Sequence, residues 1–140
     1  MSTQLTAALA AEEAAIYAYG ALGVHLTAER EIADARAAEE AHRARRDQVV
    51  SELAEQGAGT PPAPAGYELP FEVTDRASAL RLAVHVEDGV AQAWRAVLPV
   101  TEGADRSAAL SALTDTAVRA ARWRRVGKLT PTTLPFPGRP

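Results

Sequence analysis

The chain has 140 residues, of which 47% are hydrophobic and 5% aromatic, with a formal net charge of −3 and no cysteine. This length fits one domain with a single core, and the absence of cysteine excludes disulfides and thiolate-bound zinc or iron–sulfur groups. Charges of both signs are spread along the sequence, so we expect no nucleic-acid partner. Neither a basic leader nor a run of about 18 apolar residues is present, so we expect a cytoplasmic protein with no membrane partner.

The composition predicts an all-α fold, because alanine dominates while aromatic residues are scarce. Breakers such as Gly57 and the following prolines separate the helical segments. Thr27 and Asp105 are the expected N-caps of the second and fourth helices, and Thr74 or Asp75 that of the third. The predicted helices of this single domain cover residues 3–26, 27–56, 75–98 and 105–126.

The connections between these helices predict their topology. The first two helices and the last two are joined by short connections, so each pair should form an antiparallel hairpin. Residues 57–74 are rich in proline and can extend to roughly 55 Å, whereas a 25-residue helix is roughly 38 Å long. A crossover along the bundle is therefore expected, as in ferritin-like four-helix bundles, and a simple up-down bundle with a flexible loop is the alternative. Residues 127–140 form an extended tail with Phe136 as a candidate anchor.

Several ionisable residues fall on the apolar stripes of the predicted helices. Glu12 lies on the stripe of the first helix and Glu87 on that of the third. Glu39, His42 and Arg46 lie together on the stripe of the second helix. All are close to helix midpoints, so they should converge in the centre of the bundle. Because burying an unpaired carboxylate is costly, a metal pair, a proton-sharing network or an arginine must compensate.

The spacing of Glu39 and His42 is typical of a two-metal site in a four-helix bundle. Such a site takes a Glu from two helices and a Glu-x-x-His from each of the other two, and it suits iron or manganese. The fourth helix reads "TDTAVRAARWR", which offers Asp115 but no second histidine. We expect Asp115 to pair with Arg119 one turn later. The candidate metal ligands are thus Glu12, Glu39, His42 and Glu87, with Arg46 and Asp115 as candidate charge-balancing residues.

The stretches "LAAEEAAIYAYGALGVHL", "EEAHRARRDQVVSEL", "PPAPAGYELPFEVTD" and "LTDTAVRAARWR", with the late "PFPG", follow one another in a recognisable order. Over nearly the whole chain, the sequence resembles the actinobacterial ferritin-like domain proteins of unknown function. The resemblance implies a ferritin-like four-helix bundle that assembles as a homodimer. It implies no established activity, substrate or metal.

Two functional hypotheses remain, and catalytic residues are not assigned in either. In the first, the protein is a non-enzymatic ferritin-like module whose degenerate metal site has become a buried polar network, with no metal bound. In the second, it is an iron or manganese carboxylate oxidoreductase or an iron-handling protein. The missing histidine of the fourth helix favours the first, and the glutamates on the apolar stripes favour the second. Any partner other than a second copy remains unidentified.

Overall fold

The structure, a computed structural model, describes residues 1–140 and contains no β-strand. The predicted all-α fold with four helices is confirmed. A 3₁₀ turn, η1 (Leu98–Val100), follows the third helix and contains Pro99, which has no backbone N–H to continue the α-helix. The four α-helices are α1 (Ser2–Gly23), α2 (Glu29–Glu55), α3 (Arg76–Val97) and α4 (Gly103–Val126).

The helix ends differ in how their backbone groups are satisfied. Asp75 caps α3 in a capping box, in which its carboxylate accepts from the Ser78 backbone N–H at 2.8 Å. The Ser78 hydroxyl accepts in return from the Asp75 N–H. The predictions of Thr27 and Asp105 as caps were wrong, because the N-cap residues of α2 and α4 are Ala28 and Glu102 and neither makes a side-chain cap. Acidic residues in the first turns of these helices face the positive end of the helix dipole instead.

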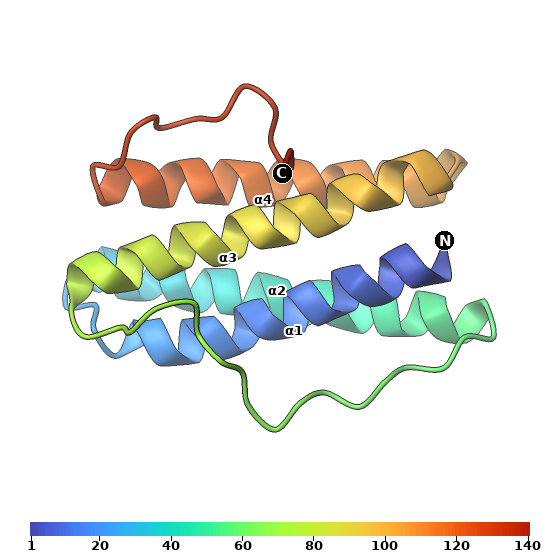
Figure 1. Cartoon of the computed structure of the whole chain (residues 1–140), viewed down its shortest axis with the longest axis horizontal. Helices are drawn as coiled ribbons and strands as arrows, with labels where there is room; N and C mark the ends of the chain where they lie inside the picture. The colour runs from blue at the N-terminus through green and yellow to red at the C-terminus, as the bar shows by residue number, and fades with distance from the viewer.

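The helices run lengthwise beside one another (Figure 1). Helices α1 and α2 are antiparallel, as are α3 and α4, and close contacts join α1 to α2, α1 to α3 and α3 to α4. The connection 57–74 runs along the length of the molecule, so α2 and α3 point in the same direction. None of the helices is both long enough and apolar enough to cross a membrane.

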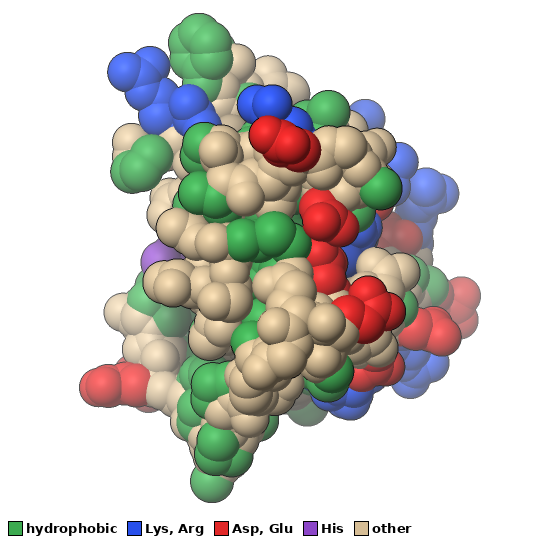
Figure 2. Space-filling view, turned by 90° about the vertical axis from the view of Figure 1, so that its right-hand side faces the viewer, with side chains coloured by type: hydrophobic (Ala, Val, Ile, Leu, Met, Phe, Trp, Pro, Cys, Tyr) green, Lys and Arg blue, Asp and Glu red, His purple; other side chains and the backbone are tan.

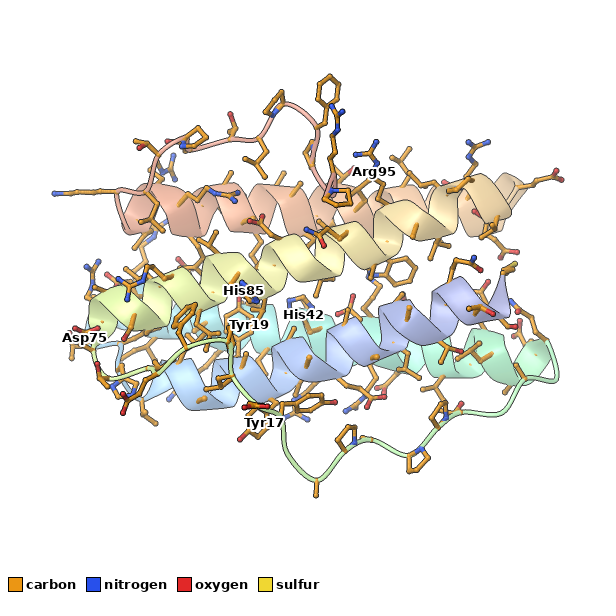
Figure 3. The ribbon with its side chains drawn as sticks, in the orientation of Figure 1. Tyr17, Tyr19, His42, Asp75, His85 and Arg95 are labelled. Carbon is orange, nitrogen blue, oxygen red and sulfur yellow. The ribbon has the colours of Figure 1, made fainter.

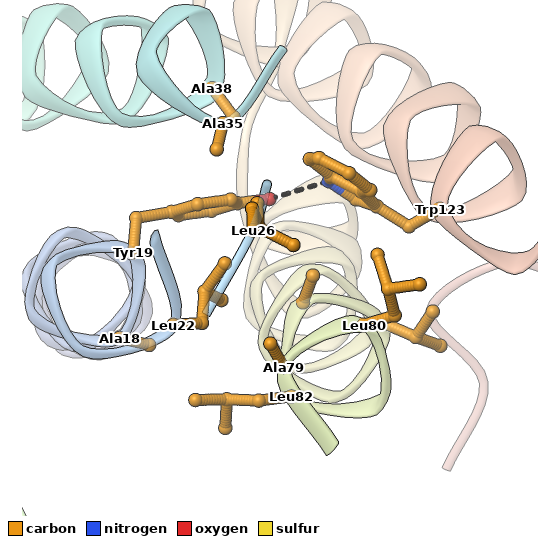
Figure 4. Packing of buried hydrophobic residues seen from close by; sticks show 12 residues of the cluster. Ala18, Tyr19, Leu22, Leu26, Ala35, Ala38, Ala79, Leu80, Leu82 and Trp123 are labelled. Atoms are coloured by element: carbon orange, nitrogen blue, oxygen red, sulfur yellow. Dashed lines mark hydrogen bonds between the residues drawn. The ribbon is translucent and has the colours of Figure 1, made fainter. Parts of the chain in front are cut away.

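The apolar core is divided into two clusters. One lies around Leu22, Leu80 and Trp123 (Figure 4), and the other around Leu9 and Leu53. Buried alanines in all four helices allow the backbones to approach closely. Both clusters draw on all four helices, so the core extends along most of the length of the molecule.

The C-terminal tail turns back over α3 and α4 (Figure 1). Gly138 is buried against the bundle, whereas Phe136 is 60% exposed. A Cβ added at Gly138 would lie 2.7 Å from the carbonyl oxygen of Ala91 and 2.9 Å from Cβ of Arg95. The expectation of Phe136 as the anchor was therefore wrong. The tail lies so close to the helix that only glycine fits at its point of contact.

Candidate functional site

His42 of α2 lies in the interior between two carboxylates from neighbouring helices. Its Nδ1 is 2.5 Å from Oε2 of Glu12 on α1, and its Nε2 is 2.9 Å from Oε2 of Glu87 on α3. The exposed fractions of all three residues are 2% or less. A carboxylate oxygen accepts hydrogen bonds, so the imidazole must donate from both nitrogens. With both carboxylates ionised, this geometry is that of the protonated, positively charged imidazolium.

A second cation approaches Glu87 from α4. Nη1 of Arg119 donates to Oε1 of Glu87 at 3.1 Å, and the arginine side chain is 22% exposed. Glu87 thus binds His42 on one side and Arg119 on the other. The arginine connects the interior to the protein surface.

Two aromatic side chains donate hydrogen bonds to the carboxylates, and a third donates to one of these two. The Tyr19 hydroxyl donates to Oε2 of Glu87 at 2.5 Å and accepts from Nε1 of Trp123 at 2.8 Å (Figure 4). The Trp94 indole donates to Oε1 of Glu12 at 2.8 Å. Tyr19 also stacks on His42, with ring centroids 5.8 Å apart, and Figure 3 shows both side chains inside the bundle. The aromatic residues therefore supply polar contacts as well as packing.

The electrostatic environment of the site supports this protonation pattern. Burial alone would lower the pKa of His42, but its hydrogen bonds to Glu12 and Glu87 outweigh burial and raise the pKa to about 9. Burial opposes ionisation of Glu87, yet the hydrogen bond and charge of His42, together with Arg119, lower its pKa. Burial and the charge of Glu87 raise the pKa of Tyr19, so its hydroxyl keeps its proton.

The network is balanced in charge and complete in hydrogen bonds. Glu12 accepts hydrogen bonds at both oxygens, and the two glutamates are matched by His42 and Arg119. The only buried side-chain polar atom without a partner is Oε1 of Gln4, outside the network. We call Glu12, Tyr19, His42, Glu87, Trp94, Arg119 and Trp123 the central network.

The central network does not have the arrangement that a metal ion requires. A metal binds neutral imidazole through a free lone pair, and both ring nitrogens of His42 are used as donors. No group of three or more His, Asp or Glu side chains is arranged so that it could hold a metal ion. The side chains, as placed, therefore do not fit the iron or manganese pair that the sequence pattern indicates.

The structure brings together only three of the four candidate metal ligands. Glu39 is partly exposed and pairs with Arg43, one turn along α2, at 3.5 Å. The buried positions of this part of α2 are Ala35, Ala38 and His42, so the stripe passes through Ala38 and leaves Glu39 at its edge. A stripe with alternating spacings of three and four residues can pass through residue 38 or residue 39. Ala38 is not polar, so the search for ionisable residues on the stripe selected Glu39.

Neither candidate charge-balancing residue contacts the buried carboxylates. Arg46 pairs with its neighbour Asp47 at the surface, at 3.0 Å. Asp115 accepts from Arg45 of α2 at 2.9 Å, so the predicted pair of Asp115 with Arg119 was wrong. Arg119 turns toward Glu87 instead, where its charge compensates a buried carboxylate.

Sequence reasoning missed Arg119 as a member of the site and treated the aromatic residues as packing alone. A count of charges offered a signal, because two buried glutamates and one histidine leave a negative charge that a cation must balance. Arg119 lies in the second half of α4, next to the buried Ala120. The aromatic residues carried a second signal, since buried Trp and Tyr usually bind a polar partner.

Comparison with known proteins identifies similar chains but no activity. The family model described as a domain of unknown function, DUF4439, matches residues 4–140. A crystal structure titled as a conserved hypothetical protein, rv2844, from Mycobacterium tuberculosis is 45% identical in sequence and has a TM-score of 0.84. The match covers 89% of this chain and 94% of that one. No curated protein matches the sequence.

Proposed function

This chain belongs to the DUF4439 family, a family of unknown function, and we propose that it is a non-enzymatic ferritin-like module in which the central network replaces a metal site. Its role is then to assemble or to bind a partner rather than to catalyse a reaction. The proposal rests on what occupies the centre of the bundle, where a ferritin-like protein would hold its metals.

The course of the chain supports the ferritin-like part of the proposal. Residues 57–74 span the molecule between α2 and α3, which point in the same direction (Figure 1). One long connection between two antiparallel hairpins is the ferritin-like topology. An up-down bundle would instead require α2 and α3 to be antiparallel.

The observation that carries the proposal is the pair of hydrogen bonds that His42 donates. Its ring lies between Glu12 and Glu87, so the positive charge between the two carboxylates is an imidazolium. On α4, where the two-metal pattern requires a Glu-x-x-His, Arg119 provides the second positive charge. Cations from the chain itself thus take the place of cations from solvent.

A fully satisfied network can define how the helices fit together. A buried ion pair adds little net stability relative to apolar residues of the same size, but a mispaired one is costly. Members of the central network come from all four helices, so rotation or sliding of any helix would leave a buried charge unpaired. We infer that the network selects a single alignment of the four helices.

Metal analysis tests the proposal. The wild type, expressed in medium supplemented with iron and manganese, should contain no stoichiometric metal. The same should hold for His42→Ala and for Glu39→Ala, which is the matched control outside the network. Nitrogen-15 spectra of the histidines should also show both His42 nitrogens protonated at pH 7. A neutral His42 ring at pH 7 would overturn the proposal.

An iron-handling or oxidoreductase role is the second candidate. It is favoured by the convergence of Glu12, His42 and Glu87 from three helices in a buried centre. This candidate requires the wild type to hold about one metal ion or more per chain. Such metal should be lost in His42→Ala and retained in Glu39→Ala, a pattern that would replace the first proposal with the second.

The homodimer implied by the family resemblance is part of the proposal. Light scattering after size-exclusion chromatography should give about twice the chain mass of 14.8 kDa. A mass of one chain at micromolar to millimolar concentration would remove the dimer from the proposal and leave the central network unaffected.

A further inference from the structure

We propose that a groove between the first half of α2 and the last half of α4 binds a small phosphorylated molecule. The inference goes beyond the proposed function, because the groove can hold a ligand whatever occupies the bundle centre. The groove encloses a cavity of about 490 Å³. Most small-molecule sites in proteins have volumes of about 300–1,000 Å³. Its charged lining residues are Arg30, Asp34, Arg119, Arg122 and Arg125.

The groove exists because α2 and α4 do not pack closely. Close helix contacts join α1 to α2, α1 to α3 and α3 to α4, whereas α2 and α4 stay apart. Trp123 and Ala38 line the cavity and separate it from the core. The opening therefore has an apolar floor and charged walls.

The charge of the groove is strongly positive in a protein whose net charge is negative. Four arginines line it with a single acid, Asp34. Arg30, Arg122 and Arg125 make no ion pair, although six other arginines of the chain do. Three unpaired arginines around one cavity favour an anionic ligand. The planar guanidinium matches phosphate in particular, because it can donate two parallel hydrogen bonds.

The opposite end of the α2–α4 face favours a small ligand over a long polyanion. Acidic residues line the cavities there, among them Asp47, Glu52, Glu55 and Asp105. Figure 2 looks onto this end of the molecule and shows acidic side chains close together. Between the two ends, Arg45 of α2 and Asp115 of α4 form an ion pair outside the groove. A nucleic acid or an anionic membrane along this face would meet repulsion, whereas a small molecule would contact the basic end alone.

Arg119 contacts both the groove and the buried Glu87. Its side chain lines the cavity, and its Nη1 donates to Glu87. This contact holds one wall of the groove in place before any ligand arrives. A bound phosphate should also stabilise the fold, since a ligand that binds only the native state raises the free energy of unfolding.

Calorimetric titration with inorganic pyrophosphate at low ionic strength tests the inference. Wild type should bind pyrophosphate, and the double variant Arg122→Gln, Arg125→Gln should bind it at least about tenfold more weakly, because each charged hydrogen bond contributes enough for about a tenfold change. Arg106→Gln is the matched control, since Arg106 is an exposed arginine of α4 outside this cavity. Its affinity should stay within about twofold of wild type.

Three results would overturn the inference. They are no binding of pyrophosphate to wild type, equal binding to wild type and the double variant, and tighter binding of a duplex DNA fragment that is lost in the double variant. Both substituted arginines are exposed, so melting temperatures near that of wild type will show that the variants fold. The metal content of the protein decides the proposed function and has no bearing on these outcomes.

Discussion

His42 carries the positive charge that lies between two buried carboxylates. Its ring donates to Glu12 and Glu87 at once, so a side chain without donors at this position would leave both carboxylates without this partner. The stability of the protein should therefore depend on this residue and on its protonation. Glu39, three positions earlier, provides the natural comparison because it is outside the central network.

Replacing His42 with alanine should destabilise the protein by about 3–5 kcal/mol, since two buried carboxylates lose their common partner. Glu39→Ala should cost less than about 1 kcal/mol, because Glu39 makes only a surface pair with Arg43. Urea denaturation monitored by circular dichroism will measure both values. Equal losses in the two variants would contradict the assignment of His42 as the centre of the network.

Stability should also decrease between neutral and alkaline pH. The folded-state pKa of His42 is about 9, above the ordinary value of 6.5. The protonated ring therefore stabilises the fold fully below pH 6.5, and this stabilisation is lost as pH rises to about 9. The difference corresponds to about 3 kcal/mol. Denaturation of the wild type at intervals from pH 6 to pH 9 will measure this decrease.

Glu87 has the opposite dependence. Its pKa is lowered by its cationic partners, so its contribution is present above the ordinary value of 4.5 and is lost as pH falls below it. The network should thus stabilise the fold most between about pH 4.5 and 6.5.

His42→Ala is the control for the decrease in stability at alkaline pH. An identical decrease in that variant would assign the effect to other groups.

Among the helices, α3 has the best-defined start. Its capping box satisfies backbone donors through Asp75 and Ser78, whereas α2 begins without a side-chain cap. The capping box also marks where the long connection ends and α3 begins. The difference between the two helices is directly testable.

Asp75→Ala should lower the melting temperature by a few degrees, because the first turn of α3 loses its side-chain acceptor. Thr27→Ala is the matched control: Thr27 is exposed and makes no capping hydrogen bond at the start of α2. Its melting temperature should equal that of wild type. Scanning calorimetry will compare the two, and a larger effect at Thr27 would show that the cap of α2 forms in solution.

In the molecule as a whole, the tail covers part of the surface formed by α3 and α4. Gly138 makes the close contact with Ala91, and its φ of +80° is one that L side chains rarely adopt. Docking of the tail therefore depends on one glycine more than on the apolar Phe136. The tail closes this side of the bundle, while the α2–α4 side stays open.

Gly138→Ala should release the tail, because the new Cβ would overlap the carbonyl of Ala91 and the backbone would be strained. Heteronuclear NOE values for residues 132–139 should decrease. Gly59→Ala is the control, since a Cβ there meets no atom within 4 Å and its φ is not positive. An ordered tail in Gly138→Ala would show that Leu134 or Phe136 suffices for docking.

The sequence by itself determined the four helices and three members of the central network. Helix periodicity, alanine content and proline or glycine breakers act over a few residues, so they can be read without the rest of the molecule. Glu12, His42 and Glu87 were predicted to point inward because apolar or small neighbours at helical spacing surround them. The proline-rich composition of residues 57–74 likewise predicted a long non-helical connection between the second and third helices.

Only the tertiary structure decided which residues complete the network. Glu39 and Ala38 both fit the stripe of α2, and a rotation of the helix by a fraction of a turn selects between them. Arg46 was the predicted cationic partner and Arg119 was not, although a long arginine side chain can reach inward or outward from either position. Which arginine balances Glu87 depends on the packing of α3 against α4, which brings Arg119 within 3.1 Å of the carboxylate and leaves Arg46 at the surface.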